Sequence, residues 1–336
     1  CPGFFNHCFI INFILNKFNF RRILIYKKNA RFYNLANMEN QENLKLGVCW
    51  ILFSAFGFAV MGLCVRLAGN LPFVQKTLFR NLIAFFVAFS TLCMKAKKDK
   101  SVFYVPREAW KFLLLRSAVG SLGIFGNFYA LGFMNISDAA MLNKMSPFFA
   151  VVASIFILGE KPNFVSAFSL IVVFTGSLFV IKPTFDFVKV FPALFAFVGG
   201  MGAGFASCFV RKLHSYNVCG DFIIVFFSLF SSLLAVPFVF FFHASMSLPQ
   251  VLILLCAGLG AACGQFGMTN AYFNAPASKI SIYDYSNIVF AGILGFVFLD
   301  QVPDIFSVAG YFIIIGTAIL VFIYNSKNAA KRQSEN

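Results

Sequence analysis

The sequence predicts an all-α integral membrane protein whose ten transmembrane helices form two inverted repeats of five helices each. Three observations predict this fold: an apolar composition, ten long apolar runs, and a repeat that relates the two halves of the chain. The chain of 336 residues is 60% apolar and 12% charged, whereas soluble domains average about 45–50% apolar and about 25% charged residues. Continuous apolar runs such as 82–94 and 251–262 exclude a transmembrane β-barrel, whose strands alternate apolar and polar residues.

Apolar runs of a length that crosses a bilayer, roughly 20 residues, follow one another along the chain. In the first half the expected spans are 46–66, 72–94, 111–133, 138–158 and 163–181. Prolines and charged residues separate them: Pro72 opens the second span, basic residues follow it, and Pro162 lies between the fourth and fifth.

The second half of the chain shows the same alternation of apolar runs and interruptions. The expected spans are 190–210, 221–242, 249–272, 277–299 and 304–324. Arg211 and Lys212 end the sixth span, Pro249 opens the eighth, and Pro303 precedes the tenth.

The 27 Lys and Arg residues are unevenly distributed over the connections. If the N-terminus is cytoplasmic, most of them fall in the tails 1–43 and 326–336 and in the even-numbered connections, above all from Lys95 to Arg116. Because cytoplasmic loops carry an excess of basic residues, we expect a multi-pass protein of the cell membrane with both termini cytoplasmic. The net charge of +15 therefore reports orientation, and no nucleic-acid partner is expected.

The first 37 residues have two interpretations. The first Met is Met38, directly before the first apolar run, so we interpret residues 1–37 as an upstream extension of the reading frame with the native start at Met38. The alternative is a basic amphipathic tail that lies on the cytoplasmic leaflet.

The two halves of the chain are related by an internal repeat. A shift of 141 residues lays 126–181 over 267–322 without a gap, and a shift of 145 aligns Gly57 with Gly202. We therefore divide the chain into one repeat over 44–182 and a second over 188–325. Because five spans is an odd number, the second copy is inverted relative to the first, and such repeats place a substrate site near the membrane midplane.

Motifs in both repeats resemble one transporter family. The first repeat has Arg80 in its second span, the segment from Ser137 to Phe149, and Leu-Gly-Glu-Lys-Pro at 158–162. The second has the segment from Ala275 to Asn287 and Leu-Asp-Gln-Val-Pro at 299–303. These motifs resemble the EamA domain of the drug/metabolite transporter superfamily.

The resemblance covers residues 46–325 and implies ten helices, cytoplasmic termini and movement of metabolites by alternating access. The second repeat departs from the pattern, because Asp300-Gln301 replaces the Gly-Glu pair and the seventh span has no counterpart of Arg80.

Ionisable side chains inside a bilayer are costly unless they are paired or hydrated, so each is a candidate site. Arg80 and Lys76 lie one turn apart in the second span and share a face. We expect Arg80 to anchor a carboxylate or phosphate, which a guanidinium binds in a bidentate manner. The alternative is a structural Arg80 paired with a carbonyl, with Lys76 extending to the membrane surface.

The fourth and ninth spans carry polar residues at equivalent positions. Asn143 and Lys144 align with Asp284 and Tyr285, and the symmetry predicts that they meet near the midplane. We expect a Lys–Asp pair that substrate or a coupling proton on Asp284 breaks; the alternative is a static buried pair. Pro147 is expected to bend the fourth span.

A third set of residues is uncharged, and its amides and phenols suit hydrogen bonding to a zwitterion or a sugar. The alternative role is hydrogen bonding between helices. The set comprises Asn127, Tyr129, Gln265, Asn270 and Tyr283, with Thr269 and Tyr272 beside them.

Charged residues at the ends of spans have a different expected role. Glu160, at the end of the fourth span, is predicted to belong to a gate; the alternative is a solvated helix end. Arg66 and Arg211, which the repeat aligns, are expected to anchor opposite membrane faces.

The remaining features favour packing. Glycine runs at 120–126, 199–204 and 260–264 predict close helix contacts. The nine Cys residues form no CxxC pair and the three His residues are scattered, so we expect no metal, no cofactor and no catalytic residues.

Together these features predict a secondary transporter that moves a small polar metabolite, an amino acid or a related anionic or zwitterionic compound. A gradient or exchange would drive it, which makes a coupling proton or counter-substrate a partner besides the lipid bilayer. The alternatives are a nucleotide-sugar exchanger and, from another class, a non-transporting membrane sensor or a lipid-modifying membrane enzyme.

Overall fold

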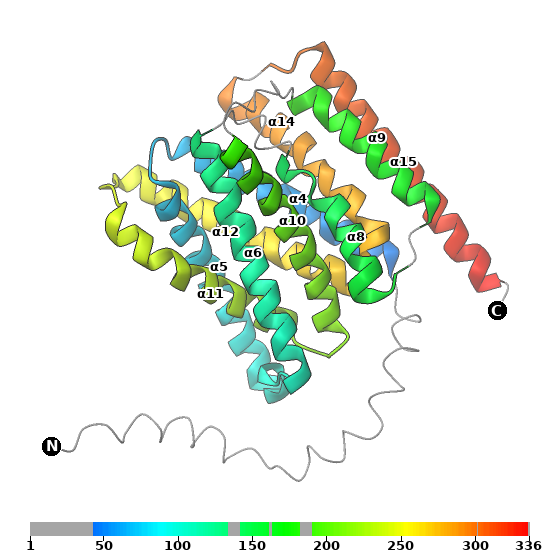
Figure 1. Ribbon diagram of the computed structural model, residues 1–336, viewed down its shortest axis with the longest axis horizontal. Coiled ribbons are helices and arrows are strands. Elements are labelled where there is room, and N and C mark those ends of the chain that lie inside the picture. Colours follow the sequence, from blue (N-terminus) through cyan, green and yellow to red (C-terminus); the bar gives the residue numbers. More distant parts are fainter. Residues whose placement is uncertain (1–42, 134–141, 161–162, 182–189, 301, 335–336) are drawn as a thin grey trace, which may run out of the picture. The chain divides into compact units, whose positions relative to one another are not determined.

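The computed structural model describes residues 43–133, 142–160, 163–181, 190–300 and 302–334, and these residues form helices and connections without strands (Figure 1). The expected tail over 1–42 and the question of the start at Met38 lie outside the described residues. The helices of the first half are α4 (Leu44–Leu67), α5 (Phe73–Lys98), the 3₁₀ turn η1 (Lys100–Phe103), α6 (Arg107–Phe133), α8 (Ser146–Leu158) and α9 (Phe164–Ile181). Those of the second half are α10 (Val190–His214), α11 (Gly220–Phe241), α12 (Leu248–Asn274), α13 (Ala277–Ile280), the 3₁₀ turn η2 (Ser281–Tyr285), α14 (Ser286–Leu299) and α15 (Ile305–Ser334).

Among the described residues, eight helical segments are long and apolar enough to cross a bilayer, and α8 is a shorter apolar helix. Large side chains on their outer faces are exposed, as Phe164 is at 83% of its surface. Exposed apolar surface of this extent marks contact with a membrane. The all-helical membrane class expected from hydropathy is therefore confirmed. α15 runs on to Ser334, beyond the end expected at 324.

Two of the expected spans are irregular. The span expected over 277–299 is confirmed as one helical segment, but within it α13 passes into the 3₁₀ turn η2 before α14 begins. Ser281 contributes to the break, since its Oγ donates to the Ala277 carbonyl at 2.7 Å and such bonds compete with the helical ladder.

The fourth expected span is interrupted at a turn on Lys144 and Met145, after which α8 starts at Ser146. Pro147 lies in the first turn of α8, where its missing N–H costs nothing. The proline therefore marks a restart of the helix instead of a bend within it. Residues 138–141, the first of the expected span, lie outside the described residues.

α8 and α14 end in the same way. Gly159 ends α8 with φ of 68° and Asp300 ends α14 with φ of 52°, the left-handed conformation that closes many helices. Asn163 and Asp304 then open α9 and α15, because their side-chain oxygens accept from the backbone N–H groups of residues 166 and 307. Helix stop and start signals therefore recur 141 residues apart.

Glycines bring α4 against α12 and α10 against α6. A Cβ atom on Gly57 of α4 would lie 2.7 Å from the Gly264 nitrogen of α12, and one on Gly202 of α10 would lie 2.6 Å from the Val119 carbonyl of α6. Ser54 Oγ donates to the Gly264 carbonyl across the first contact at 2.7 Å. The backbones thus touch where side chains are absent, as the glycine runs predicted.

The other helix pairs also join the two halves of the chain. α5 packs against α11, α9 lies beside α15 (Figure 1), α8 packs on α10, and α14 packs on α4. Each of these pairs joins a helix from 44–182 to a helix from 190–325.

Candidate functional site

A lysine and an aspartate meet where the fourth and ninth expected spans are interrupted. Lys144 Nζ lies 3.7 Å from Asp284 Oδ2, and the two side chains are 15% and 18% exposed. Lys144 Nζ also donates to Asn287 Oδ1 at 3.0 Å, and the Tyr285 hydroxyl donates to the Lys144 carbonyl at 2.7 Å. The expectation that these positions converge is confirmed.

The Lys144–Asp284 pair lies where two helices are irregular. Lys144 occupies the turn before α8, and Asp284 lies in η2 before α14. Helix breaks leave backbone groups available to a ligand, and in membrane transporters they frequently form the substrate site. Asn287 anchors the break to a third helix, since its Nδ2 donates to the Ala55 carbonyl of α4 at 2.9 Å.

Two further predicted residues lie in the same interruptions. The backbone of Asn143 packs against α10, where a Cβ on Gly200 would lie 3.2 Å from its carbonyl oxygen. Tyr283 of η2 is buried at 3% exposure, and its hydroxyl has no hydrogen-bond partner among the described residues. A buried hydroxyl without a partner is costly, so Tyr283 retains its interpretation as a ligand contact.

Arg80 and Lys76 have different surroundings although they share a helix. Lys76 Nζ donates to the carbonyls of Val65 and Gly69 at 3.2 and 2.6 Å, which are the contacts of a cation that caps the end of α4. Arg80 is buried at 8% exposure, and its Nε has no hydrogen-bond partner in the described chain. The contacts of Lys76 match the alternative interpretation, whereas those of Arg80 leave its donors available.

Arg116 is a buried cation that the sequence analysis placed among the basic residues of a cytoplasmic connection. In the structure it belongs to α6 and is 3% exposed. Its Nη2 donates to Gln265 Oε1 of α12 at 3.1 Å, and its guanidinium carbon lies 3.8 Å from the centre of the Phe227 ring of α11. Its position inside the expected span 111–133 was the signal that could have identified it.

Other residues of the uncharged set contact neighbouring helices or their own. The Tyr129 ring packs on Phe195 with 4.9 Å between centroids. Asn270 Nδ2 donates to the Phe266 carbonyl one turn earlier at 2.8 Å. The backbone N–H of Asn127 lies close to Gly199 of α10. The contacts named here involve neither the Lys144–Asp284 pair nor Arg80.

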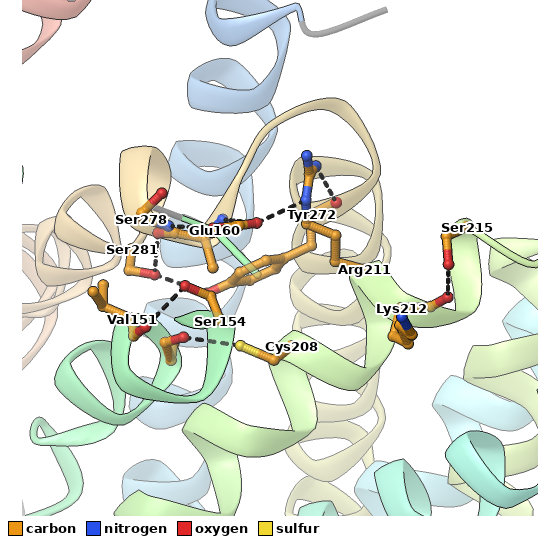
Figure 2. A network of polar contacts seen from close by, with 12 residues as sticks. Val151, Ser154, Glu160, Cys208, Arg211, Lys212, Ser215, Tyr272, Ser278 and Ser281 are labelled. Carbon is orange, nitrogen blue, oxygen red and sulfur yellow. Dashed lines mark hydrogen bonds and ion pairs between the residues drawn. The ribbon is translucent and has the colours of Figure 1, made fainter. Parts of the chain in front are cut away.

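Glu160 joins the ends of four helical elements (Figure 2). Its Oε1 lies 3.0 Å from Arg211 Nε of α10, and its Oε2 accepts from the Ser278 N–H of α13 at 3.1 Å. Arg211 Nη1 donates to the Tyr272 carbonyl of α12 at 3.2 Å. We call these contacts the Glu160–Arg211 network.

This network corrects the expectation for Arg211. The two side chains of the ion pair are 7% and 11% exposed, so Arg211 is a buried partner of Glu160 and not a surface anchor. Arg66, its counterpart in the sequence repeat, is exposed. Glu160, in turn, is not a solvated helix end.

The described residues contain no group of three His, Cys, Asp or Glu side chains that is placed to bind a metal ion. Their seven cysteines are free thiols.

Comparisons with known proteins show the family of this chain. Residues 45–182 match the model of the EamA-like transporter family. The chain is similar to the pseudopaline exporter CntI of Pseudomonas aeruginosa, at 30% identity over 82% of this chain and 95% of the exporter. It is also similar to human solute carrier family 35 member G1, at 26% identity over 84% of this chain and 81% of the carrier.

A solved crystal structure shares the fold, with a TM-score of 0.74 and 16% identity over 84% of this chain and 98% of that one. The pseudopaline exporter and the human solute carrier are named as transporters and not as enzymes. At 30% identity over nearly the whole length of a relative, the chain belongs to the EamA-like transporter family and is a membrane transporter.

Proposed function

We propose that this transporter moves a small polar metabolite, an amino acid or a related anionic or zwitterionic compound, by alternating access driven by a gradient or by exchange. The observation that carries the proposal is the Lys144–Asp284 pair at two interrupted helices. A charged pair with 3.7 Å between its atoms is loose for an ion pair, and its two charges match the two ends of a zwitterion.

The proposed architecture is ten spans in two inverted repeats, 44–182 and 188–325, with both termini cytoplasmic in the cell membrane. The contacts between glycines support it. Exchanging the two repeats maps Gly57 on Gly202 and Gly264 on Gly123, and Gly202 packs near Gly123 as Gly57 packs on Gly264. Reporter fusions at each terminus would test the orientation, and an outward-facing terminus would contradict it.

The Glu160–Arg211 network is proposed as the inner gate. It ties α8, α10, α12 and α13 together at one end, so a path between these helices requires the pair to separate. Alternating access supplies that separation when the central site opens to the cytoplasm. Asp284 is proposed to carry the coupling proton, since it is the acid that faces Lys144.

Export is the favoured direction, because a relative at 30% identity is named as an exporter. The nucleotide-sugar exchanger has less support, since Lys76 caps α4 instead of joining Arg80 in binding phosphate.

Proteoliposomes of the full chain test the transport function. We expect uptake of a labelled amino acid from a panel to fall at least tenfold in Asp284→Asn and Lys144→Gln. Lys98→Gln, which neutralises an exposed cation, serves as the matched control. Flux that is unchanged in both pair variants would overturn the role of the pair, and Asp284→Asn with wild-type pH dependence would overturn proton coupling.

A further inference from the structure

Arg80 and Arg116 form a second buried charged site, which we call the arginine pair. The two residues are 8% and 3% exposed, and no carboxylate pairs with either one in the described chain. Both Nε atoms are without a hydrogen-bond partner among those residues. Their positive charges are close enough to act on each other. Two like charges are therefore buried together without an anion.

α11 contacts the helices of both arginines at neighbouring positions. Phe227 lies under the Arg116 guanidinium, and Ser231 accepts a hydrogen bond from Asn81, the neighbour of Arg80. Residues 227 and 231 are one turn apart and share a face of the helix. The helices of Arg80 and Arg116 thus contact neighbouring positions on one face of α11.

Buried hydroxyls lie on the same helices. They occur at i, i+3 or i, i+4 spacing from one another or from an arginine, which places them on shared faces. None of them has a hydrogen-bond partner in the described part of the chain. They are Thr77 on α5, Ser117 and Ser121 on α6, and Ser228 and Ser232 on α11.

Such a site requires a counter-charge. An uncompensated charge inside a protein is strongly unfavourable, and a guanidinium has five N–H donors, of which one donates to an acceptor of the described residues in Arg116. A single monoanion would leave one of the two positive charges unneutralised. One solute with two negative charges would satisfy both arginines, and the buried hydroxyls on the same helices are further donors available to it.

We propose that Arg80 and Arg116 together bind a single dianionic solute, such as a dicarboxylate or a phosphate monoester. The inference rests on the proposed transport function and narrows its substrate class. Gly120 is part of the site, because a Cβ there would lie 2.6 Å from Arg116 Nη1 and 3.0 Å from the Phe227 ring. The missing side chain leaves the room that the guanidinium occupies.

The test measures thermal stabilisation of the purified full chain by succinate, inorganic phosphate and acetate at constant ionic strength. We expect both dianions to stabilise at concentrations at least tenfold lower than acetate. Arg80→Gln and Arg116→Gln should each weaken this effect about 10- to 100-fold, since hydrogen bonds to charged groups are strong. Without added anion, each variant should unfold at a higher temperature than the wild type, because the repulsion is removed.

A smaller substitution tests the site in case the arginine variants do not fold. Gly120→Ala should weaken the dianion effect by displacing the Arg116 guanidinium, whereas Gly62→Ala, at a glycine with open space around it, should leave it unchanged. Acetate that is as effective as the dianions, or arginine variants that keep the wild-type preference, would overturn the proposal.

Flux separates this inference from the transport proposal. If proteoliposomes of both arginine variants still move an amino acid at the wild-type rate, the dianion site fails and the transport function stands. If dianions stabilise only the wild type and no solute moves, the site stands and the transport proposal fails.

Discussion

The Glu160–Arg211 network and the arginine pair both bury guanidinium groups, but they differ in how the charge is balanced. Arg211 has a carboxylate at 3.0 Å and a backbone carbonyl at 3.2 Å. Among the described residues, Arg116 contacts the amide oxygen of Gln265 and the face of an aromatic ring, and the Nε of Arg80 has no hydrogen-bond partner. The protein itself neutralises the first site, whereas the second is the site for which an external dianion is proposed.

The largest expected effect is at the balanced site. Glu160→Ala leaves Arg211 buried and unpaired, which costs about 3–5 kcal/mol for a buried pair. The thermal unfolding temperature in detergent should therefore drop by several degrees, and Glu160→Ala/Arg211→Met should recover much of it. If Glu160→Ala left the unfolding temperature unchanged, the charge balance of the Glu160–Arg211 network would not distinguish it from the arginine pair.

The Lys144–Asp284 pair should show an intermediate effect, because its side chains are partly exposed and its contact is longer. We expect Asp284→Asn to cost about 1–3 kcal/mol, the range for leaving a hydrogen-bonding partner unsatisfied. Chemical denaturation of the purified chain measures this. If Asp284→Asn lost as much unfolding free energy as Glu160→Ala, the Lys144–Asp284 pair would be a static structural pair.

The arginine pair should respond in the opposite direction. Arg80→Gln removes one of two like charges and should stabilise the anion-free protein by about 0.5–2 kcal/mol, as stabilising substitutions at functional sites commonly do. Thermal unfolding in chloride-free buffer is the measurement. A destabilised variant would mean that Arg80 holds the helices together and would erase the contrast with Arg211.

The smallest effect is expected where a cation is exposed. Lys95 Nζ lies 2.8 Å from Asp221 Oδ1, and the two side chains are 57% and 7% exposed. Because the Lys95 ammonium is largely hydrated and Gln keeps an N–H donor, Lys95→Gln should cost about 1 kcal/mol, the upper end for a solvent-exposed ion pair, and the cost should shrink with salt. The free energy of unfolding, measured in about 50 mM and about 500 mM NaCl, checks this, because the higher salt screens exposed charges more strongly. A salt-independent loss would contradict it.

The membrane class, the ranges of most helices and the Lys144–Asp284 contact could be predicted from sequence. Hydropathy predicts spans because a bilayer requires long apolar helices, and the alignment of Lys144 and Asp284 in the repeat indicated that they meet. The position of Glu160 was also identified, since charged residues at the end of a span are few.

The partners of these charges could not be predicted, because they depend on contacts between distant segments. Glu160 meets Arg211 and the start of α13 only after four helices have packed. Arg116 was assigned to a connection because basic residues near the end of a span usually mark orientation. The 3₁₀ turn η2 could not be predicted, because residues 281–285 contain no proline or glycine.

The glycine contacts have a mechanical consequence. α4 meets α12, and α10 meets α6, at glycines where backbone atoms of the two helices come into direct contact. Backbone surfaces in direct contact have no rotamers with which to adjust, so each of these pairs resists shear and tends to move as one rigid block. Each block contains one helix from each half of the sequence. In the proposed alternating-access cycle, the moving bodies would therefore not be the two halves of the chain, 44–182 and 188–325.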